Sequence, residues 1–389
     1  MSRLEPAFAI AREWAGEGLE ALVLSGSHAN GEAVWVVHEG REISLSDLDL
    51  YAVMRDPSTA EAGAARARAA TAGLAARLLA LGCAAPLEVA FLTRGDLARQ
   101  PARPGTIELA RCGRVVWGDP GVTSALPRWN VSDVPFEEAR LLLENRAFEL
   151  LDAAPASARP GAGALELLHA RHALLKSAAD LAAVLCLARG ELPEGTAGRV
   201  AWASAHVLPQ LAAVLPTEWG DAAEHLPRLW RTALDWKAGV VHPLAGAEAR
   251  AEWHTVVRCW CAVWWLTGDE PRRDVWERAL EVAARAPLRR RLRQAVEHAP
   301  RSGRPEPALR RLRALLAGTP QHRVNGSAGV LLLAAASSSP ARPALPVGAL
   351  RALRVLGVTQ AAQWDEARAE VLRAWDERVL DGQRTAGAA

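Results

Sequence analysis

The stretch from Leu22 to Val53 constrains the fold of this chain more than any other. It begins with an apolar run that predicts a short buried strand, and that run stops at the turn residues Ser25-Gly26-Ser27. It ends with an alternating segment that carries Asp47 and Asp49. Because successive side chains of a strand point to opposite faces, the two carboxylates project from the same face, about 6–7 Å apart. The stretch therefore predicts a strand, a glycine turn and a second strand with paired carboxylates.

A third carboxylate follows on another predicted strand. Glu88 stands between apolar residues in the run Pro86–Leu92, where an acidic side chain is unusual. Carboxylate oxygens hold hard divalent cations. A Gly-Ser turn has no bulky side chain, so its backbone N–H groups can approach a phosphate. Three carboxylates beside such a turn outline a two-metal site for phosphoryl transfer.

In this order the residues resemble the pattern of the nucleotidyltransferase superfamily. That superfamily includes DNA polymerase β and the small antibiotic, or aminoglycoside-type, nucleotidyltransferases with a C-terminal helical domain. The pattern is an apolar strand, Gly-Ser, a helix, Asp-x-Asp on a strand, and a third acidic residue on a later strand. Gly26-Ser27, Asp47-x-Asp49 and Glu88 match it, and the resemblance covers about residues 18–120. It implies an enzyme that uses two Mg²⁺ ions and a nucleoside triphosphate.

The resemblance also implies a role for each residue. Gly26 and Ser27 would bind the nucleotide phosphates, and Asp47, Asp49 and Glu88 would bind the metal ions and carry catalysis. Glu88 would in addition accept the proton of the attacking hydroxyl as a general base. The reaction would transfer a nucleotidyl group, most often adenylyl, to a hydroxyl of a small-molecule acceptor.

Lysine is rare in this chain, which contains only Lys176 and Lys237. On one predicted helix, His169, His172, Lys176 and Asp180 follow one another at steps of three, four and four, so they share a face. By the resemblance, Lys176 would bind the nucleotide and neutralise the leaving pyrophosphate. The alternative is a solvated helix face with a Lys176–Asp180 pair.

One departure from the family pattern is the length of chain between Gly26 and Asp47. The extra residues predict a β-hairpin, with strands at 33–37 and 42–45 on either side of a turn at 39–41. This insertion suggests that the helix after Gly-Ser is short.

Composition argues against several classes of protein. The chain has 389 residues and a net charge of +2, so no strong overall field attracts nucleic acid or a membrane surface. Residues 1–18 lack the apolar core of a signal peptide, and no run of about 18 apolar residues predicts a membrane span. Five cysteines at no framework spacing predict reduced thiols. We expect a cytoplasmic protein without membrane or nucleic-acid partners, and composition leaves its oligomeric state open.

The order of the predicted elements indicates an α+β fold. A nucleotidyltransferase domain with a small mixed sheet is expected over residues 1–125, an all-helical domain over 130–320 and a helical extension over 345–380. Helices are predicted at 5–19, 59–81, 136–151 (ended by Pro155), 165–189, in several pieces over 197–285, and at 347–356 and 360–380; two strands are predicted within 106–120, and a linker at 319–346.

Two other functions fit the same residues. One is a catalytically inactive protein that binds a nucleotide or a partner. The other is a nucleotidyltransferase that modifies a protein, or that serves as the antitoxin-like half of a pair. The tryptophan-rich helices after residue 200 leave a similar choice. Burial statistics favour a bulky core, and the alternative is a wall on which a base or sugar stacks.

Overall fold

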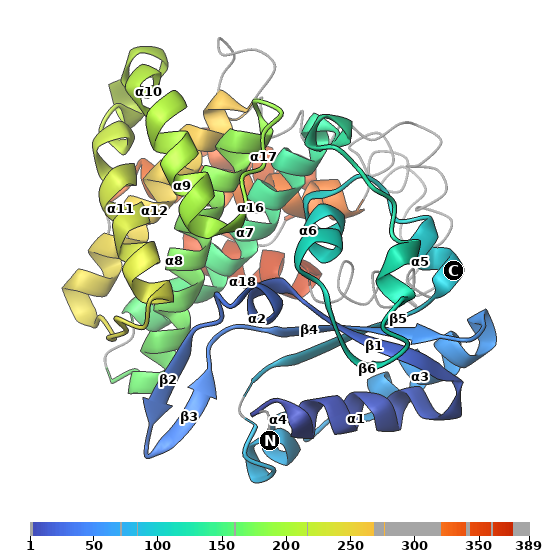
Figure 1. The fold of residues 1–389 in the computed structure, drawn as a ribbon. Coiled ribbons are helices and arrows are strands. Elements are labelled where there is room, and N and C mark those ends of the chain that lie inside the picture. The colour runs from blue at the N-terminus through green and yellow to red at the C-terminus, as the bar shows by residue number, and fades with distance from the viewer. Residues whose placement is uncertain are drawn as a thin grey trace, which may run out of the picture.

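The computed structural model describes residues 3–267 except 71, 84, 159, 160 and 216, residue 276, and residues 320–375 except 340–342 and 359–360. These residues form a mixed α+β fold with a small mixed sheet and many helices (Figure 1). The α+β class is confirmed, and the three domain boundaries stay predictions. Helices predicted between 268 and 285 lie outside the described residues, apart from residue 276.

The four-stranded sheet has the order β5-β4-β1-β6. Its strands are β1 (Leu19–Ser25), β4 (Leu48–Met54), β5 (Leu87–Thr93) and β6 (Arg114–Gly118). β4 runs antiparallel to β1 and parallel to β5, and β6 is antiparallel to β1. The strand of the paired aspartates therefore lies between the strand that leads into the glycine turn and the strand that carries the third carboxylate.

A hairpin, β2 (Trp35–His38) and β3 (Arg41–Ser44), accounts for the inserted length before the paired aspartates. Glu39 and Gly40 close it with positive φ angles of 50° and 72°, the geometry that matches the twist of the flanking strands. The helix after the glycine turn, α2 (Gly26–Asn30), has five residues. The predicted hairpin and the short helix are both confirmed.

Helices cover both faces of the sheet. One face packs against α1 (Glu5–Ala15), α3 (Pro57–Ala70) and α4 (Leu74–Ala80). The other packs against α5 (Arg94–Ala98) and α6 (Pro104–Cys112). In Figure 1 the first three helices lie below the sheet, and the helical part of the chain lies above it. The side chains of β4 alternate between these faces, so its leucines enter the lower core and Asp49 lies on the opposite face, as does Asp47, which precedes the strand and meets Lys176 of the helical part.

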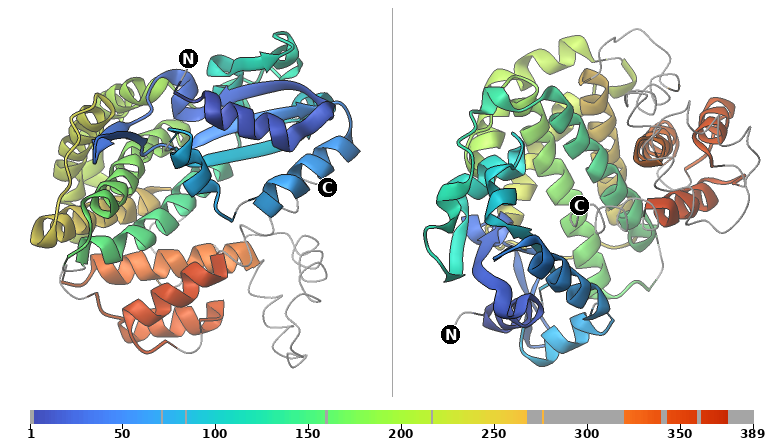
Figure 2. Two further views of the ribbon diagram at one scale, coloured as in Figure 1. Left: turned by 90° about the horizontal axis from the view of Figure 1, so that it is seen from below. Right: turned by 90° about the vertical axis from the view of Figure 1, so that its right-hand side faces the viewer.

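The helical part begins with two long antiparallel helices, and later helices pack around them (Figure 2). The C-terminal helices, orange and red in Figure 2, lie against the green and yellow helices and share their apolar core. The helices are α7 (Phe136–Ala158), α8 (Ala164–Leu187), α9 (Gly195–His206), α10 (Leu208–Val214), α11 (Ala222–Lys237), α12 (Gly246–Leu266), α16 (Pro320–Ala336), α17 (Val347–Leu356) and α18 (Trp364–Trp375), with short 3₁₀ turns at Gly16–Gly18, Val122–Ala125, Val131–Asp133 and Thr217–Trp219.

Tryptophans fill the core of the helical part. Trp230, Trp253, Trp260 and Trp364 are all at most 4% exposed. Each indole N–H donates a hydrogen bond of 2.8–2.9 Å to a backbone carbonyl of a neighbouring helix, those of Ala178, Leu150, Leu143 and Leu331 respectively. A buried indole N–H needs such a partner. For these residues the core interpretation is confirmed, and they do not form an exposed stacking wall.

Two predicted helices end at other residues than the prediction gave. The single helix expected at 59–81 is two helices, α3 and α4, because Gly73 between them takes a left-handed φ of 79°. Conversely, α7 continues past Pro155 to Ala158. Proline weighs against a helix through its lost N–H and its clash with the preceding turn, yet α7 packs closely against α8 and continues through this position.

The strand predicted at 106–110 is wrong, because these residues belong to α6. Pro104 sits in the first turn of that helix, the one helical position that tolerates proline. Ile107 and Leu109 are both buried, one in the core of the helical part and one against the sheet face that α5 and α6 cover. A helix can bury neighbouring positions against two different layers, and the short apolar run did not distinguish it from a strand.

The linker predicted at 319–346 is also wrong over most of its length. Helix α16 occupies Pro320–Ala336, and its apolar half, Val330–Ala336, is fully buried. Asn325, part of the Asn-Gly pair that suggested a turn, is 2% exposed and donates a 2.7 Å hydrogen bond to Glu144 of α7. Tertiary packing thus overrides the local turn preference. No helix among the described residues is both long and apolar enough to cross a membrane.

Candidate functional site

The glycine turn lies against the paired aspartates. Ser25, the last residue of β1, pairs with Asp49 in the antiparallel β1–β4 register. Gly26 follows with a φ of +65°, and a Cβ added to it would collide with the Oδ2 atom of Asp49. Only glycine combines this backbone conformation with so close an approach. Ser27, partly exposed, is the next residue of α2.

The carboxylates gather on two neighbouring strands. Asp49 pairs with Glu88 in the parallel β4–β5 register, and Asp47 precedes β4 by one residue. Burial, followed by the negative charges of Glu88 and Asp47, raises the pKa of Asp49 to about 7. Lys176 and Arg146 oppose that shift without cancelling it. Asp49 is therefore a carboxylate that holds a proton near neutral pH unless a cation replaces it.

His28 of α2 holds the segment before Asp47 in place. Its Nε2 atom lies 3.1 Å from the hydroxyl of Ser44 and 3.3 Å from the carbonyl oxygen of Ser46. Ser46 in turn accepts a 3.0 Å hydrogen bond from the backbone N–H of Val34. Burial lowers the pKa of His28. No sequence pattern marked His28 as part of the site, although it directly follows the Gly-Ser pair.

Lys176 reaches the aspartates from helix α8. Its Nζ atom lies 3.3 Å from Oδ2 of Asp47 and 3.3 Å from Oε1 of Glu149 on α7. Burial and the neighbouring Arg146 would lower the pKa of Lys176, but Glu149, Asp47 and Asp180 outweigh them and leave it raised. The alternative Lys176–Asp180 pair does not form, so this lysine crosses from the helical part to the sheet.

Arg146 of α7 pairs with Asp180, the residue expected to pair with Lys176. Its Nε atom donates a 2.6 Å hydrogen bond to Asp180, and its terminal N–H group bonds to Glu149. Burial would lower the pKa of Arg146, and the charges of Glu149 and Asp180 raise it instead. Arg146 and Glu149 thus connect Lys176 to both long helices, a relation that the helical spacing on α8 alone did not reveal.

The other two histidines of the predicted face differ from each other. His172 accepts a 3.0 Å hydrogen bond at Nδ1 from the indole of Trp236, and burial together with nearby cations lowers its pKa to about 3. His169, one turn earlier, is exposed. His172 is therefore a neutral structural group, packed behind the lysine.

A second ion pair joins the sheet part to the helical part. Glu32, just after α2, accepts hydrogen bonds from the backbone N–H and hydroxyl of Thr196, 2.7 and 2.6 Å long. Lys237 lies 3.1 Å from the same carboxylate. Both lysines of the chain thus pair with carboxylates that belong to the Gly26–Asp47 segment.

The donor chemistry of the site fits a hard divalent cation. Carboxylates on adjacent strands, one with a pKa near 7 through burial and mutual repulsion, are the oxygen ligands that Mg²⁺ takes. Among the described residues, however, no three His, Cys, Asp or Glu side chains are already arranged around a common metal position. The backbone brings Asp47, Asp49 and Glu88 close together, and the ammonium group of Lys176 lies beside Asp47.

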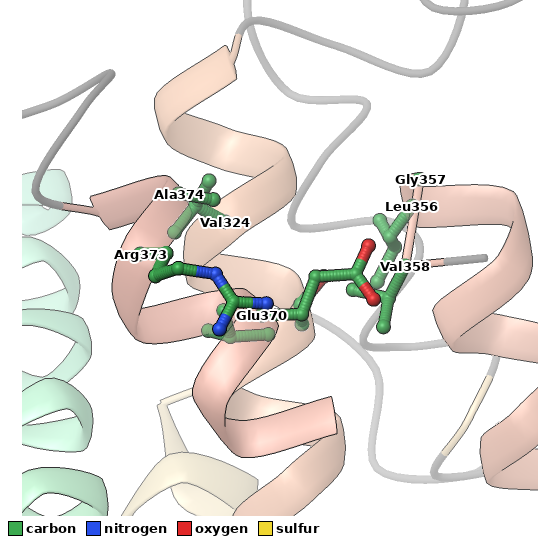
Figure 3. A pocket seen from close by; sticks show the side chains of 9 residues that line it. Val324, Leu356, Gly357, Val358, Glu370, Arg373 and Ala374 are labelled. Atoms are coloured by element: carbon green, nitrogen blue, oxygen red, sulfur yellow. The ribbon is translucent and has the colours of Figure 1, made fainter. Parts of the chain in front are cut away.

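A cavity of about 140 Å³ lies elsewhere, among the C-terminal helices α16, α17 and α18. Figure 3 shows Glu370 and Arg373 beside its apolar residues Leu356 and Val358. None of the predicted site residues lines it. It is therefore separate from the carboxylate cluster.

The predicted site residues come from four separate elements and the residue that directly precedes one of them. Gly26 and Ser27 are on α2, Asp47 and Asp49 at and within β4, Glu88 on β5 and Lys176 on α8. No protein-family model, curated protein sequence or solved structure matches this chain.

Proposed function

We propose that this protein is a Mg²⁺-dependent nucleotidyltransferase that transfers a nucleotidyl group, adenylyl by preference, from a nucleoside triphosphate to a hydroxyl of a small-molecule acceptor. The observation that carries the proposal is the placing of Asp49. It touches the glycine turn on one side, pairs with Glu88 on the other, and lies within the electrostatic reach of Lys176. The proposal includes the nucleotidyltransferase arrangement of the sheet and a cytoplasmic location, where five free thiols stay reduced.

Each group has a part in the chemistry. The acceptor oxygen attacks the α-phosphorus. The bond between that phosphorus and the oxygen that bridges the α- and β-phosphates breaks, and pyrophosphate leaves. Glu88 takes the proton of the attacking hydroxyl. Gly26 and Ser27 hold the β- and γ-phosphates, and Lys176 neutralises the charge that develops on pyrophosphate. Two Mg²⁺ ions held by Asp47, Asp49 and Glu88 would supply charge stabilisation at the attacking and leaving oxygens.

A second candidate is a protein that binds the nucleotide without turning it over. The observation that favours it is the ion pair between Lys176 and Asp47, which occupies a proposed metal ligand. Transfer to a protein instead of a small molecule is a variant of the first proposal. It uses the same site and differs only in the acceptor.

Calorimetric titration of ATP, GTP, CTP and UTP, each with and without Mg²⁺, tests the proposal. We expect Mg²⁺-dependent binding of one nucleotide by the wild type, and its loss in Asp47→Asn/Asp49→Asn. Asp235→Asn is the matched control, because Asp235 is exposed on α11. Binding followed by release of labelled pyrophosphate with an acceptor supports transfer. Binding without turnover, with or without Mg²⁺, favours the second candidate, and no binding of any nucleotide under either condition excludes both.

A further inference from the structure

Lys176 has two anchors, and they belong to different parts of the molecule. Asp47 lies at the edge of the sheet, and Glu149 lies on α7, each 3.3 Å from the lysine Nζ atom. The Asp47 side chain is 42% exposed, and that of Glu149 is 30% exposed. Lys176 can therefore keep its contact with one of these carboxylates while it loses its contact with the other.

The site cannot keep both anchors while it works as proposed. A divalent cation at Asp47 attracts that carboxylate more strongly than an ammonium does, because it carries twice the charge at a shorter distance. Lys176 would then lose its contact with the sheet. A free lysine side chain samples many rotamers, and ordering it again costs conformational entropy.

Glu149 is built to stay in place through that change. Its Oε1 atom meets both Lys176 and Arg146, its neighbour one turn earlier on α7. Arg146 is in turn fixed to α8 by its 2.6 Å hydrogen bond to Asp180. Two cations and two carboxylates therefore form a chain of contacts that joins both long helices and does not involve the sheet.

We propose that Glu149 is a positioning residue, which keeps Lys176 pointed into the site after Asp47 has exchanged the lysine for a cation. Arg146 and Asp180 hold Glu149 for this purpose. The inference rests on the proposed function. Under it, Lys176 passes from Asp47 to the phosphates of the nucleotide while its contact with Glu149 persists.

The scarcity of lysine allows a direct test. A chain labelled with ¹³C at lysine Cε gives two lysine side-chain signals, from Lys176 and Lys237. An immobilised lysine shows inequivalent Hε protons, and a mobile one shows averaged protons. Lys237, held by Glu32, serves as the internal reference for an intact fold.

The first measurement is made without metal, on variants in which Lys176 has lost its contact with the sheet. In Asp47→Asn, we expect the Lys176 signal to stay immobilised, since Glu149 still holds it. In Asp47→Asn/Glu149→Gln, we expect averaging. A mobile Lys176 in Asp47→Asn alone overturns the proposal, and this outcome does not depend on whether Glu149→Gln folds.

The second measurement uses Mg²⁺ and inorganic pyrophosphate as probes. In the wild type, Mg²⁺ should shift the Lys176 signal but leave its Hε protons inequivalent, whereas in Glu149→Gln it should average them. Pyrophosphate affinity should fall about tenfold in Glu149→Gln, as for other losses of a supporting contact. Glu137→Gln, with an exposed glutamate on the same helix, is the control.

The two measurements separate the two proposals. If Mg²⁺ leaves the Lys176 signal of the wild type unchanged, the metal site at Asp47 fails. If Mg²⁺ shifts that signal equally in the wild type and in Glu149→Gln, with the same pyrophosphate affinity, the metal site stands and the role of Glu149 fails.

Discussion

Asp49 and Glu88 lie side by side in the parallel register of β4 and β5. Burial and this neighbour raise the pKa of Asp49 to about 7. The carboxylate is thus held in a place that favours its protonated form. Such a shift has consequences for stability as well as for function.

We expect Asp49→Asn to stabilise the protein at pH 8. The pKa of Asp49 is higher in the folded state than in the unfolded chain, so between about pH 4 and pH 7 the folded state binds more protons. The free energy of unfolding therefore falls as the pH rises through this window. Asparagine removes this term and should raise the free energy of unfolding on the order of 2 kcal/mol at pH 8, and by little at pH 4. Urea unfolding at both pH values measures it.

The control for this prediction is Asp235→Asn, on an exposed stretch of α11. It should change stability equally at the two pH values. An Asp49→Asn protein that is less stable than the wild type at pH 8 would show that the Asp49 carboxylate is stabilised in the folded protein, and would contradict the raised pKa.

Gly26→Ala should separate backbone strain from contact with Asp49. Gly26 and Gly31 have φ angles of +65° and +80°, so alanine strains both by about 1 kcal/mol. A Cβ at Gly31 meets nothing within 4 Å, whereas one at Gly26 collides with Asp49. We expect Gly26→Ala to cost more than Gly31→Ala, and the excess to vanish in an Asp49→Ala background. Thermal unfolding of the wild type, Gly26→Ala, Asp49→Ala and Gly26→Ala/Asp49→Ala forms the cycle, and Gly31→Ala is the control.

Equal costs at Gly26 and Gly31 would mean that the turn relaxes away from the carboxylate. The same proteins also report on function. Gly26→Ala should weaken Mg²⁺-dependent nucleotide binding because it displaces Asp49, and Gly31→Ala should leave that binding close to the wild-type value.

The strands of the site were predictable because their signals are local. Alternation placed the side chains of Asp47 and Asp49 on one face, and the Gly-Ser turn marked where β1 ends. The helices α6 and α16 were missed for the opposite reason. Their apolar residues match no single local template, and only packing against α7 and α12 makes Pro320–Ala336 a buried helix.

The contacts of Lys176 could not be derived from spacing. The lysine and Asp47 are 129 positions apart, and only the packing of α8 over the sheet joins them. The helical spacing put Asp180 within reach of Lys176, but Arg146 on another helix binds that aspartate instead. Residues far apart in sequence compete for the same partner, and local rules do not rank them.

Trp260→Phe tests the core role of the tryptophans. Trp260 is 1% exposed and donates to the carbonyl of Leu143, so phenylalanine leaves a void and removes a hydrogen bond. We expect a loss of about 2 kcal/mol in the free energy of unfolding. Trp117→Phe, at a tryptophan that is 40% exposed, should cost far less. Nucleotide affinity should be unchanged in Trp260→Phe, and a selective loss of affinity would instead support a stacking role.

His172→Gln should make the protein more resistant to acid. The pKa of His172 is about 3 in the folded state, below its ordinary value of 6.5, because burial and nearby cations disfavour the charged ring. Between these values the unfolded chain binds more protons, so the wild type loses stability as the pH falls from 6.5, by at most about 1.4 kcal/mol per pH unit. Glutamine removes this slope and can still accept the hydrogen bond from Trp236.

Urea unfolding at pH 7 and pH 5 measures this effect. The free energy of unfolding should differ less between the two pH values for His172→Gln than for the wild type. His242→Gln, at an exposed histidine, is the control. An unchanged difference in His172→Gln would mean that His172 titrates in the folded protein much as it does in the unfolded chain.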